Sequence, residues 1–281
     1  MNGLGASAGF GVLSAASWGG ADFAGGIGSR RAPALLVTAF GQAISLLLLI
    51  PVCLALGISM PAGHSLVFAV IGGFEGALAL AIFYRALALG AMGLTAALTG
   101  LLTALVPVVF SLTRYGLPSP FTAAGLAAGC AAIWLITHPS GRTGTPTPVH
   151  SLLLGALAGA GFGAQLIFFK MAEGASLLGI MTAARAAGVT ALLLVMLWAR
   201  PRGSGRSYWL PATVSGLLDT AGNLLYMRAV QFGRLDAAAV ICSLYPAGTI
   251  LLAALLLRER PSRRQWAGMA LALGAVALLS F

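Results

Sequence analysis

Three acidic residues lie inside long apolar stretches of this sequence: Asp22, Glu75 and Asp219. A charge at membrane depth costs roughly 2.5–3.5 kcal/mol on insertion scales, so such residues usually face a protein interior or a water-filled cavity. Glu75 and Asp219 fall one position apart when the two halves of the chain are aligned. We expect them either to bind a substrate ammonium group or a coupling proton, or to pair with Arg185. Asp22 lies toward one end of its stretch, which favours a structural role.

Polar and aromatic side chains share helix faces with these acids. Asn223 and Tyr226 follow Asp219 by four and seven positions, and Trp18 precedes Asp22 by one helical turn. Such faces would enclose a cavity with aromatic walls and a few hydrogen-bonding groups. The residues predicted to bind a substrate are Trp18, Glu75, Phe83, Thr99, Thr103, Phe162, Gln165, Phe169, Asp219, Asn223, Tyr226 and Ser243.

Two prolines fall inside polar stretches, Pro107 after a series of threonines and Pro246 after Ser243 and Tyr245. Proline in a helix interior removes a backbone hydrogen bond and bends the chain. Threonine hydroxyls can satisfy carbonyls that are freed in this way. Pro107 and Pro246 are therefore predicted to act as hinges.

The elements that must position these residues are apolar and of membrane length. Of the 281 residues, 59% are hydrophobic and 8% are charged, and the mean hydropathy is +0.97. About twenty apolar residues cross the hydrocarbon core of a bilayer as a helix. The sequence predicts an all-α integral membrane protein with ten transmembrane helices. Their ranges are 4–28, 33–57, 65–89, 93–115, 120–138, 151–173, 176–199, 207–230, 236–258 and 262–281.

The second half of the chain repeats the first at a spacing of 143 residues. Gly73 matches Gly216, and the pair Pro118-Ser119 matches Pro261-Ser262. Five crossings per repeat is an odd number, so the second repeat must enter the membrane inverted relative to the first. The predicted organisation is a first five-helix repeat at 1–138, a connecting loop at 139–150 and a second repeat at 151–281. Inverted repeats of this kind are typical of secondary transporters, which bind their substrate between the halves near mid-membrane.

The formal net charge of +10 does not indicate a nucleic-acid partner. Most basic residues lie at the ends of apolar stretches, where they contact the membrane surface and fix orientation. Connections after odd-numbered helices hold eleven basic residues and those after even-numbered helices hold four. This bias predicts odd connections in the cytoplasm and both termini outside. The expected partners are the lipid bilayer and a small-molecule substrate, and the oligomeric state is left open.

Residue types that other chemistry needs are sparse. His64, His138 and His150 lie at or near predicted loops without metal-ligand spacing, and the three cysteines are scattered through apolar stretches. No Gly-rich loop with a following Lys indicates ATP hydrolysis. No Ser or Cys nucleophile has a His at matching depth. The sequence therefore predicts no enzyme activity, no metal site and no cofactor.

Two segments of the sequence resemble the ten-helix EamA-type branch of the drug/metabolite transporter superfamily. One is Trp18-Gly19 with Phe23, and the other runs from Tyr245-Pro246 through Leu257-Arg258-Glu259-Arg260 to Gly268. The resemblance implies export of amino acids, aromatic and other neutral ones, or of related small metabolites. It also implies a central cavity lined by helices 1, 3, 4, 6, 8 and 9, in a multi-pass protein of the bacterial inner (plasma) membrane.

Two alternatives to amino-acid export stay open at this point. A cavity with aromatic walls and acidic groups suits a hydrophobic cation equally well, which describes a multidrug or cationic-compound efflux transporter. A membrane scaffold or enzyme subunit without flux of its own is the alternative from another class. In either transport hypothesis the two bundles alternate access by tilting about a fixed central site.

Overall fold

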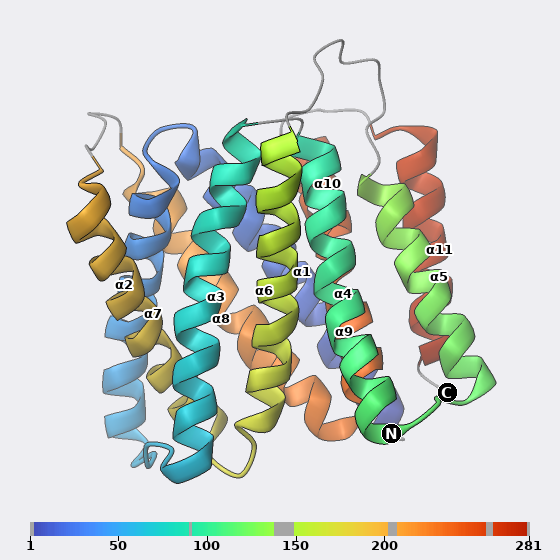
Figure 1. Ribbon diagram of the computed structural model, residues 1–281, viewed down its shortest axis with the longest axis horizontal. Coiled ribbons are helices and arrows are strands. Elements are labelled where there is room, and N and C mark those ends of the chain that lie inside the picture. Colours follow the sequence, from blue (N-terminus) through green and yellow to red (C-terminus); the bar gives the residue numbers. More distant parts are fainter. Residues whose placement is uncertain (1–2, 90–91, 138–148, 202–206, 257–260, 280–281) are drawn as a thin grey trace.

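A computed structural model describes residues 3–89, 92–137, 149–201, 207–256 and 261–279 of the chain. Within these ranges the chain forms helices joined by short connections, and none of them contains a strand. The helices run alongside one another as a bundle (Figure 1). They are α1 (Gly3–Ser29), α2 (Ala34–Ala55), α3 (Gly63–Leu89), α4 (Met92–Tyr115), α5 (Pro120–Thr137), α6 (Val149–Met171), α7 (Leu177–Ala199), α8 (Trp209–Phe232), α9 (Leu235–Cys242), α10 (Tyr245–Leu256) and α11 (Arg263–Leu279).

A helix occupies each of the ten predicted ranges, and the ninth range holds two, α9 and α10. Six segments in the described ranges are long and apolar enough to cross a membrane. They are 34–55, 63–86, 98–115, 149–171, 177–199 and 235–256. The fold is thus all-helical with several membrane-length segments, while the number of crossings and the inverted repeat stay predictions.

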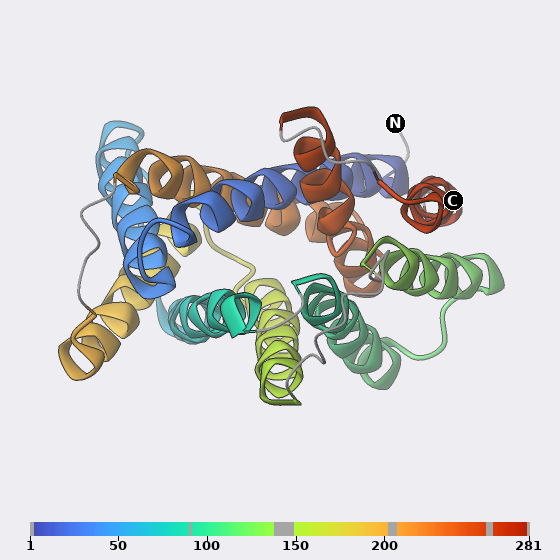
Figure 2. The ribbon, with the colours of Figure 1, turned by 90° about the horizontal axis from the view of Figure 1, so that it is seen from above.

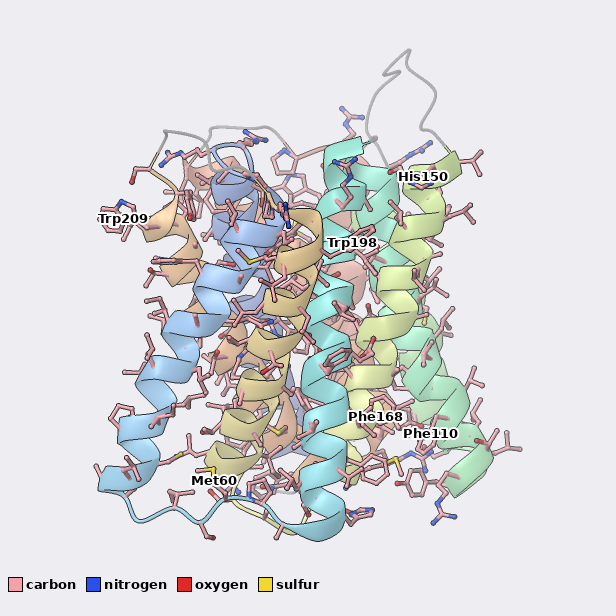
Figure 3. The ribbon with its side chains drawn as sticks, turned by 60° about the vertical axis from the view of Figure 1, so that its left-hand side comes forward. Met60, Phe110, His150, Phe168, Trp198 and Trp209 are labelled. Atoms are coloured by element: carbon pink, nitrogen blue, oxygen red, sulfur yellow. The ribbon has the colours of Figure 1, made fainter. Side chains whose placement is uncertain are left out.

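The outer surface of the bundle is apolar. Leu54 of α2 and Leu197 of α7 are 77% and 73% exposed, as expected for side chains that face lipid tails. Trp198 and Trp209 are exposed toward the end of the bundle where His150 lies (Figure 3). Tryptophan is enriched at both interfaces of a membrane. This surface fits a multi-pass membrane protein.

Both termini lie at one end of the bundle, whereas α5 ends and α6 begins at the other (Figure 1). Residues 149 and 150, which the sequence places in the connecting loop at 139–150, belong to α6 in the structure, because this helix begins at Val149. Residues 138–148 lie outside the described residues. The first five helices and the later helices therefore start from opposite ends of the bundle.

The predicted ninth helix is broken. The sequence predicts one kinked helix at 236–258, whereas α9 and α10 are separated at Ser243 and Leu244. Pro246 explains the break, because it has no N–H to donate to the carbonyl of Cys242 and its ring clashes with that carbonyl in a continuous helix. Pro107, by contrast, lies inside an uninterrupted α4. The two predicted hinges thus differ: one follows a break, and the other lies within a helix.

Contacts between the helices are reciprocal. α1 packs along α8 and α6 along α3, while α2 packs on α8 and α7 on α3. α5 pairs with α11, and Figure 2 shows these two side by side at one edge of the bundle. With α9 and α10 counted as one helix, α1 to α5 correspond in order to α6 to α11. The contact of α1 with α8 then has its counterpart in the contact of α6 with α3, and the contact of α2 with α8 in that of α7 with α3.

The closest helix crossings obey the spacing of 143 residue by residue. A Cβ at Gly73 of α3 would overlap the backbone of Ala184 in α7, and a Cβ at Gly216 of α8 would overlap the backbone of Gly41 in α2. Gly216 and Ala184 stand 143 positions after Gly73 and Gly41, respectively. Small residues at such crossings let two helix backbones approach closely. The same crossing therefore occurs twice.

The pair of α5 and α11 follows the same rule. Gly125 lies against Leu279, and Gly268 lies against Ile136. Gly268 follows Gly125 by 143 positions, and Leu279 follows Ile136 by the same spacing. Both glycines lie within helices, and the missing side chain makes room for a side chain of the neighbouring helix. The reciprocal pairing is what an inverted repeat requires.

The repeated Pro-Ser pairs begin equivalent helices. Ser119 accepts a hydrogen bond from the backbone N–H of Thr122 at 3.2 Å, directly before α5. Ser262 accepts one from the N–H of Gln265 at 3.2 Å, and the Gln265 side chain accepts the N–H of Ser262 at 2.8 Å. The second arrangement is a capping box, which satisfies two backbone donors at the start of α11.

Candidate functional site

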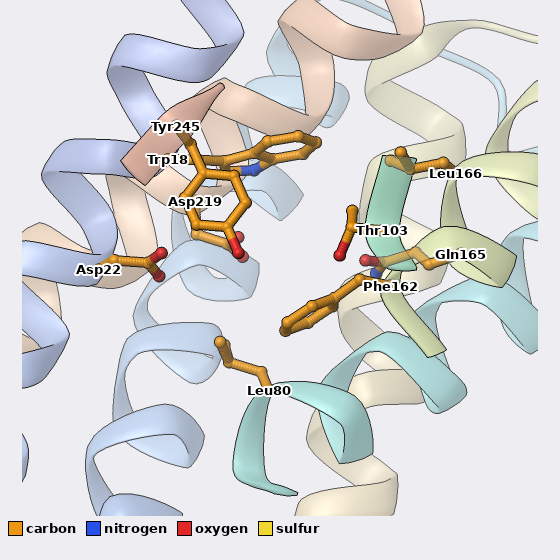
Figure 4. A pocket seen from close by; sticks show the side chains of 9 residues that line it. All are labelled: Trp18, Asp22, Leu80, Thr103, Phe162, Gln165, Leu166, Asp219 and Tyr245. Atoms are coloured by element: carbon orange, nitrogen blue, oxygen red, sulfur yellow. The ribbon is translucent and has the colours of Figure 1, made fainter. Parts of the chain in front are cut away.

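A cavity lies between the two halves, with walls from α1, α3, α4, α6, α8 and α10 (Figure 4). It holds about 420 Å³ of space free of protein atoms, its open mouth included. Small-molecule sites are concave and mostly apolar, with a few polar groups that orient the ligand, and the lining of this cavity has that character. Its lining residues are Trp18, Asp22, Leu80 and Thr103 from the first half, and Phe162, Gln165, Leu166, Asp219 and Tyr245 from the second.

Five of the predicted substrate-binding residues line this cavity together: Trp18, Thr103, Phe162, Gln165 and Asp219. Figure 4 shows Asp22, Asp219 and Tyr245 on one side of the space, and Thr103, Phe162 and Gln165 on the other. The acids therefore face neutral polar and aromatic groups across the cavity.

Asp219 is the centre of a polar cluster on α8. Its Oδ2 accepts a hydrogen bond from Nη2 of Arg185 on α7 at 2.5 Å, and the two side chains are 20% and 4% exposed. Nδ2 of Asn223 donates to Oδ1 of Asp219 at 3.2 Å, and Nε of Arg185 donates to Oγ1 of Thr220 at 3.0 Å. The sequence leaves open whether Asp219 binds substrate or pairs with Arg185, and the structure shows the pair.

Asp22 of α1 lines the cavity together with Asp219. No hydrogen bond or ion pair joins Asp22 to another described residue. The position of Asp22 in the sequence favours a structural role, and Asp22 is not among the residues predicted to bind a substrate. The signal that places it at the cavity is its position one turn after Trp18, on the same face of α1.

Glu75 of α3 does not line the cavity. Its Oε1 lies against Gly161 of α6, and its Oε2 is buried without a hydrogen-bond partner among the described residues. The position equivalent to Asp219 at a spacing of 143 is Gly76. The side chain of Gln165 fills the space in front of Gly76 and donates a hydrogen bond to the carbonyl of Gly72 at 3.2 Å.

Aromatic rings form a wall where α1, α8 and α10 meet. Trp18 stacks on Tyr226 with ring centroids 6.1 Å apart and meets Tyr245 edge-on at 6.4 Å. The hydroxyl of Tyr226 donates to the carbonyl of Leu166 at 2.8 Å. Tyr226 is fully buried and so supports the cavity from behind Trp18 rather than lining it.

The remaining predicted residues also lie behind the cavity surface. Oγ1 of Thr99 donates to the carbonyl of Gly155 at 2.8 Å, which joins α4 to α6. Phe83 packs against Phe162 with ring centroids 5.9 Å apart, and Phe169 belongs to the buried core. Ser243 is buried at the break between α9 and α10, and its hydroxyl has no partner in the part of the chain described.

Two residues that carry the family resemblance meet at this site. A Cβ at Gly19 would lie 2.7 Å from the carbonyl oxygen of Tyr245 and 2.9 Å from Cα of Gly248. Oγ1 of Thr249 donates to the carbonyl of Gly19 at 3.1 Å. The Trp-Gly pair of α1 and the Tyr-Pro pair of α10 therefore form one junction, while the Arg-Glu-Arg segment at 258–260 lies outside the described residues.

Residues 150–281 match the EamA-like transporter family. This EamA-like domain spans almost all of α6 and the helices up to α11, and it supports a place in the drug/metabolite transporter superfamily. The match and the apolar helices together support a multi-pass membrane transporter. No curated protein matches the chain.

The fold of the whole chain occurs in solved structures, of which 29 chains match. One of them, described as a crystal structure of a protein, superposes with a TM-score of 0.78 at 21% sequence identity. The superposition covers 97% of this chain and 95% of the other. The EamA-like domain is thus part of an arrangement that extends over both halves.

Proposed function

We propose that this chain is a secondary transporter that exports amino acids, mainly aromatic and other neutral ones, and related small metabolites across the bacterial inner membrane. The observation that carries the proposal is the cavity between the halves, to which α1, α3 and α4 contribute from one half and α6, α8 and α10 from the other. Secondary transporters built from inverted repeats bind their substrates at this interface.

The reciprocal helix contacts support alternating access. Gly73 with Ala184 and Gly41 with Gly216 form equivalent crossings on the two sides of the cavity. In an inverted pair of bundles, exchanging the conformations of the halves converts an opening on one side into an opening on the other. Pro107 in α4 and Pro246 at the start of α10 lie in the segments that change shape in this mechanism.

The cavity wall suits an aromatic amino acid. Trp18, Tyr245 and Phe162 offer ring surfaces for the side chain of the substrate. The amide of Gln165 has a second N–H besides the one bonded to Gly72 and can donate it to the carboxylate of the substrate. The ammonium group of a zwitterionic amino acid would then lie beside Asp22 and Asp219, and its carboxylate would lie on the opposite side of the cavity. The other predicted residues are buried behind the lining and hold it in place; they are Phe83, Thr99, Phe169, Asn223, Tyr226 and Ser243.

Counterflow into liposomes tests the proposal. Liposomes that contain the purified protein and are loaded with unlabelled tryptophan or phenylalanine are expected to accumulate the labelled amino acid. Phe162→Ala should reduce this uptake. Phe168→Ala is the matched control, since Phe168 lies on the same helix but packs on Phe68 outside the cavity lining. Absence of counterflow for all twenty amino acids would refute amino-acid export.

Efflux of hydrophobic cations is the second candidate. The observation that favours it is Asp22, an acid beside aromatic rings with no partner among the described residues. A quaternary ammonium compound that is taken up in counterflow, and that amino acids do not displace, would select this function instead.

A further inference from the structure

The charged groups around the cavity do not balance. Two carboxylates, Asp22 and Asp219, line it, and Arg185 pairs with Asp219 behind the wall. Asp22 makes no ion pair with any described residue. An ionised Asp22 therefore leaves one negative charge at membrane depth that no described residue balances, and a cation entering the cavity would balance it. Such residues mark substrate or ion pathways in membrane proteins.

Asp22 differs from the residue at the equivalent position of the other half in having no hydrogen bond to a neighbouring helix. Asp22 and Gln165 stand 143 positions apart, which is the spacing that relates the reciprocal crossings, and both line the cavity. Gln165 is neutral and its amide donates to the carbonyl of Gly72 on the neighbouring helix. An amide thus serves the structural role in one half, while the equivalent carboxylate in the other half has no such bond.

The surroundings of Asp22 suit an organic cation rather than a bare metal ion. Trp18 lies one turn away on α1, and Tyr245 reaches the same side of the cavity (Figure 4). Aromatic faces attract ammonium groups within about 6 Å of the ring centroid. Leu80 and Leu166 complete an apolar lining, which favours a cation attached to an apolar body.

We propose that Asp22 binds the cationic group of the transported molecule, an amine carried on an aromatic or apolar body. Asp219, for which the sequence predicts either this role or a pair with Arg185, instead holds Arg185 and fixes the wall next to it. This inference rests on the proposed function, because it assumes that the cavity is the transport site.

Three ligands with the same ring and different charges test the assignment. Tryptamine carries the amine alone, indole-3-propionate the carboxylate alone, and tryptophan both. Binding of each to purified protein is measured by equilibrium dialysis for the wild type, for Asp22→Asn and for Glu173→Gln. Glu173→Gln removes the same charge from an exposed position after α6 and serves as control.

We expect Asp22→Asn to weaken tryptamine by at least about tenfold, as for a lost charge contact in a desolvated site. Indole-3-propionate should bind Asp22→Asn as well as or better than the wild type, which also shows that the variant is folded. Equal tryptamine affinity in wild type and Asp22→Asn, or an equal loss for all three ligands, would overturn the assignment and leave the transport proposal standing. A wild type that binds none of the three refutes both.

Discussion

The ion pair of Arg185 and Asp219 leads to a prediction that can be worked out in magnitude. Their side chains are 4% and 20% exposed and 2.5 Å apart, so neither charge is well screened by solvent. Removing one partner of a buried pair costs about 3–5 kcal/mol, because the other charge stays buried and unpaired. At 2–4 °C per kcal/mol for chains of comparable size, Asp219→Leu or Arg185→Met should lower the unfolding temperature by roughly 6–20 °C.

Replacing both partners should restore most of the lost stability, since an apolar pair of similar volume is often neutral relative to a buried ion pair. A thiol-reactive dye in detergent measures unfolding, because Cys53 and Cys242 are buried and free in the folded protein. The double variant Arg185→Met with Asp219→Leu should unfold well above either single variant. Single variants that unfold within 2 °C of the wild type, or losses that simply add, would refute the reasoning.

Three further predictions concern packing and helix ends. Leucine at Gly73 or at Gly216 should prevent folding, because each Cβ overlaps a neighbouring backbone, whereas leucine at Gly274, which has no neighbour within 4 Å, should elute normally in size exclusion. Ser262→Ala removes a helix cap and should cost about 1 kcal/mol, seen as a drop of a few degrees in the same dye assay. Tyr226→Phe loses its bond to α6 and should cost about 1 kcal/mol; an unchanged unfolding temperature would contradict the role given to that hydroxyl.

The depth of each acid could be read from the sequence, but the direction of its side chain could not. Glu75 and Asp219 are offset by one position in the repeat, and one residue rotates a side chain by about 100° around a helix axis. Asp219 therefore points to the cavity while Glu75 points to Gly161 on α6. An offset that looks negligible in an alignment moves a carboxylate from one interface to another.

The ion-pair partner of each acid could not be predicted from the sequence, for a related reason. Arg185 could be named as a candidate partner of either acid, but the choice depends on how α7 crosses α3 and α8, which the apolar pattern does not specify. The break before Pro246 shows the same limit, because proline predicts a bend and the surrounding packing decides whether the helix stops. Ten helical ranges, by contrast, follow from apolar length alone, and the helices of the described residues lie on them.

The break at Ser243 separates a fully buried segment from one with an exposed face. All eight residues of α9 are buried, whereas Leu251 and Leu255 of α10 are 39% and 75% exposed. α10 packs chiefly along α1. Twelve helical residues span about 18 Å, so a 20° tilt at the break displaces the far end of α10 by about 6 Å while α9 stays in place. Spin labels on α10 and α4 should therefore report a wide distribution of separations in lipid, and labels on α9 and α4 a narrow one.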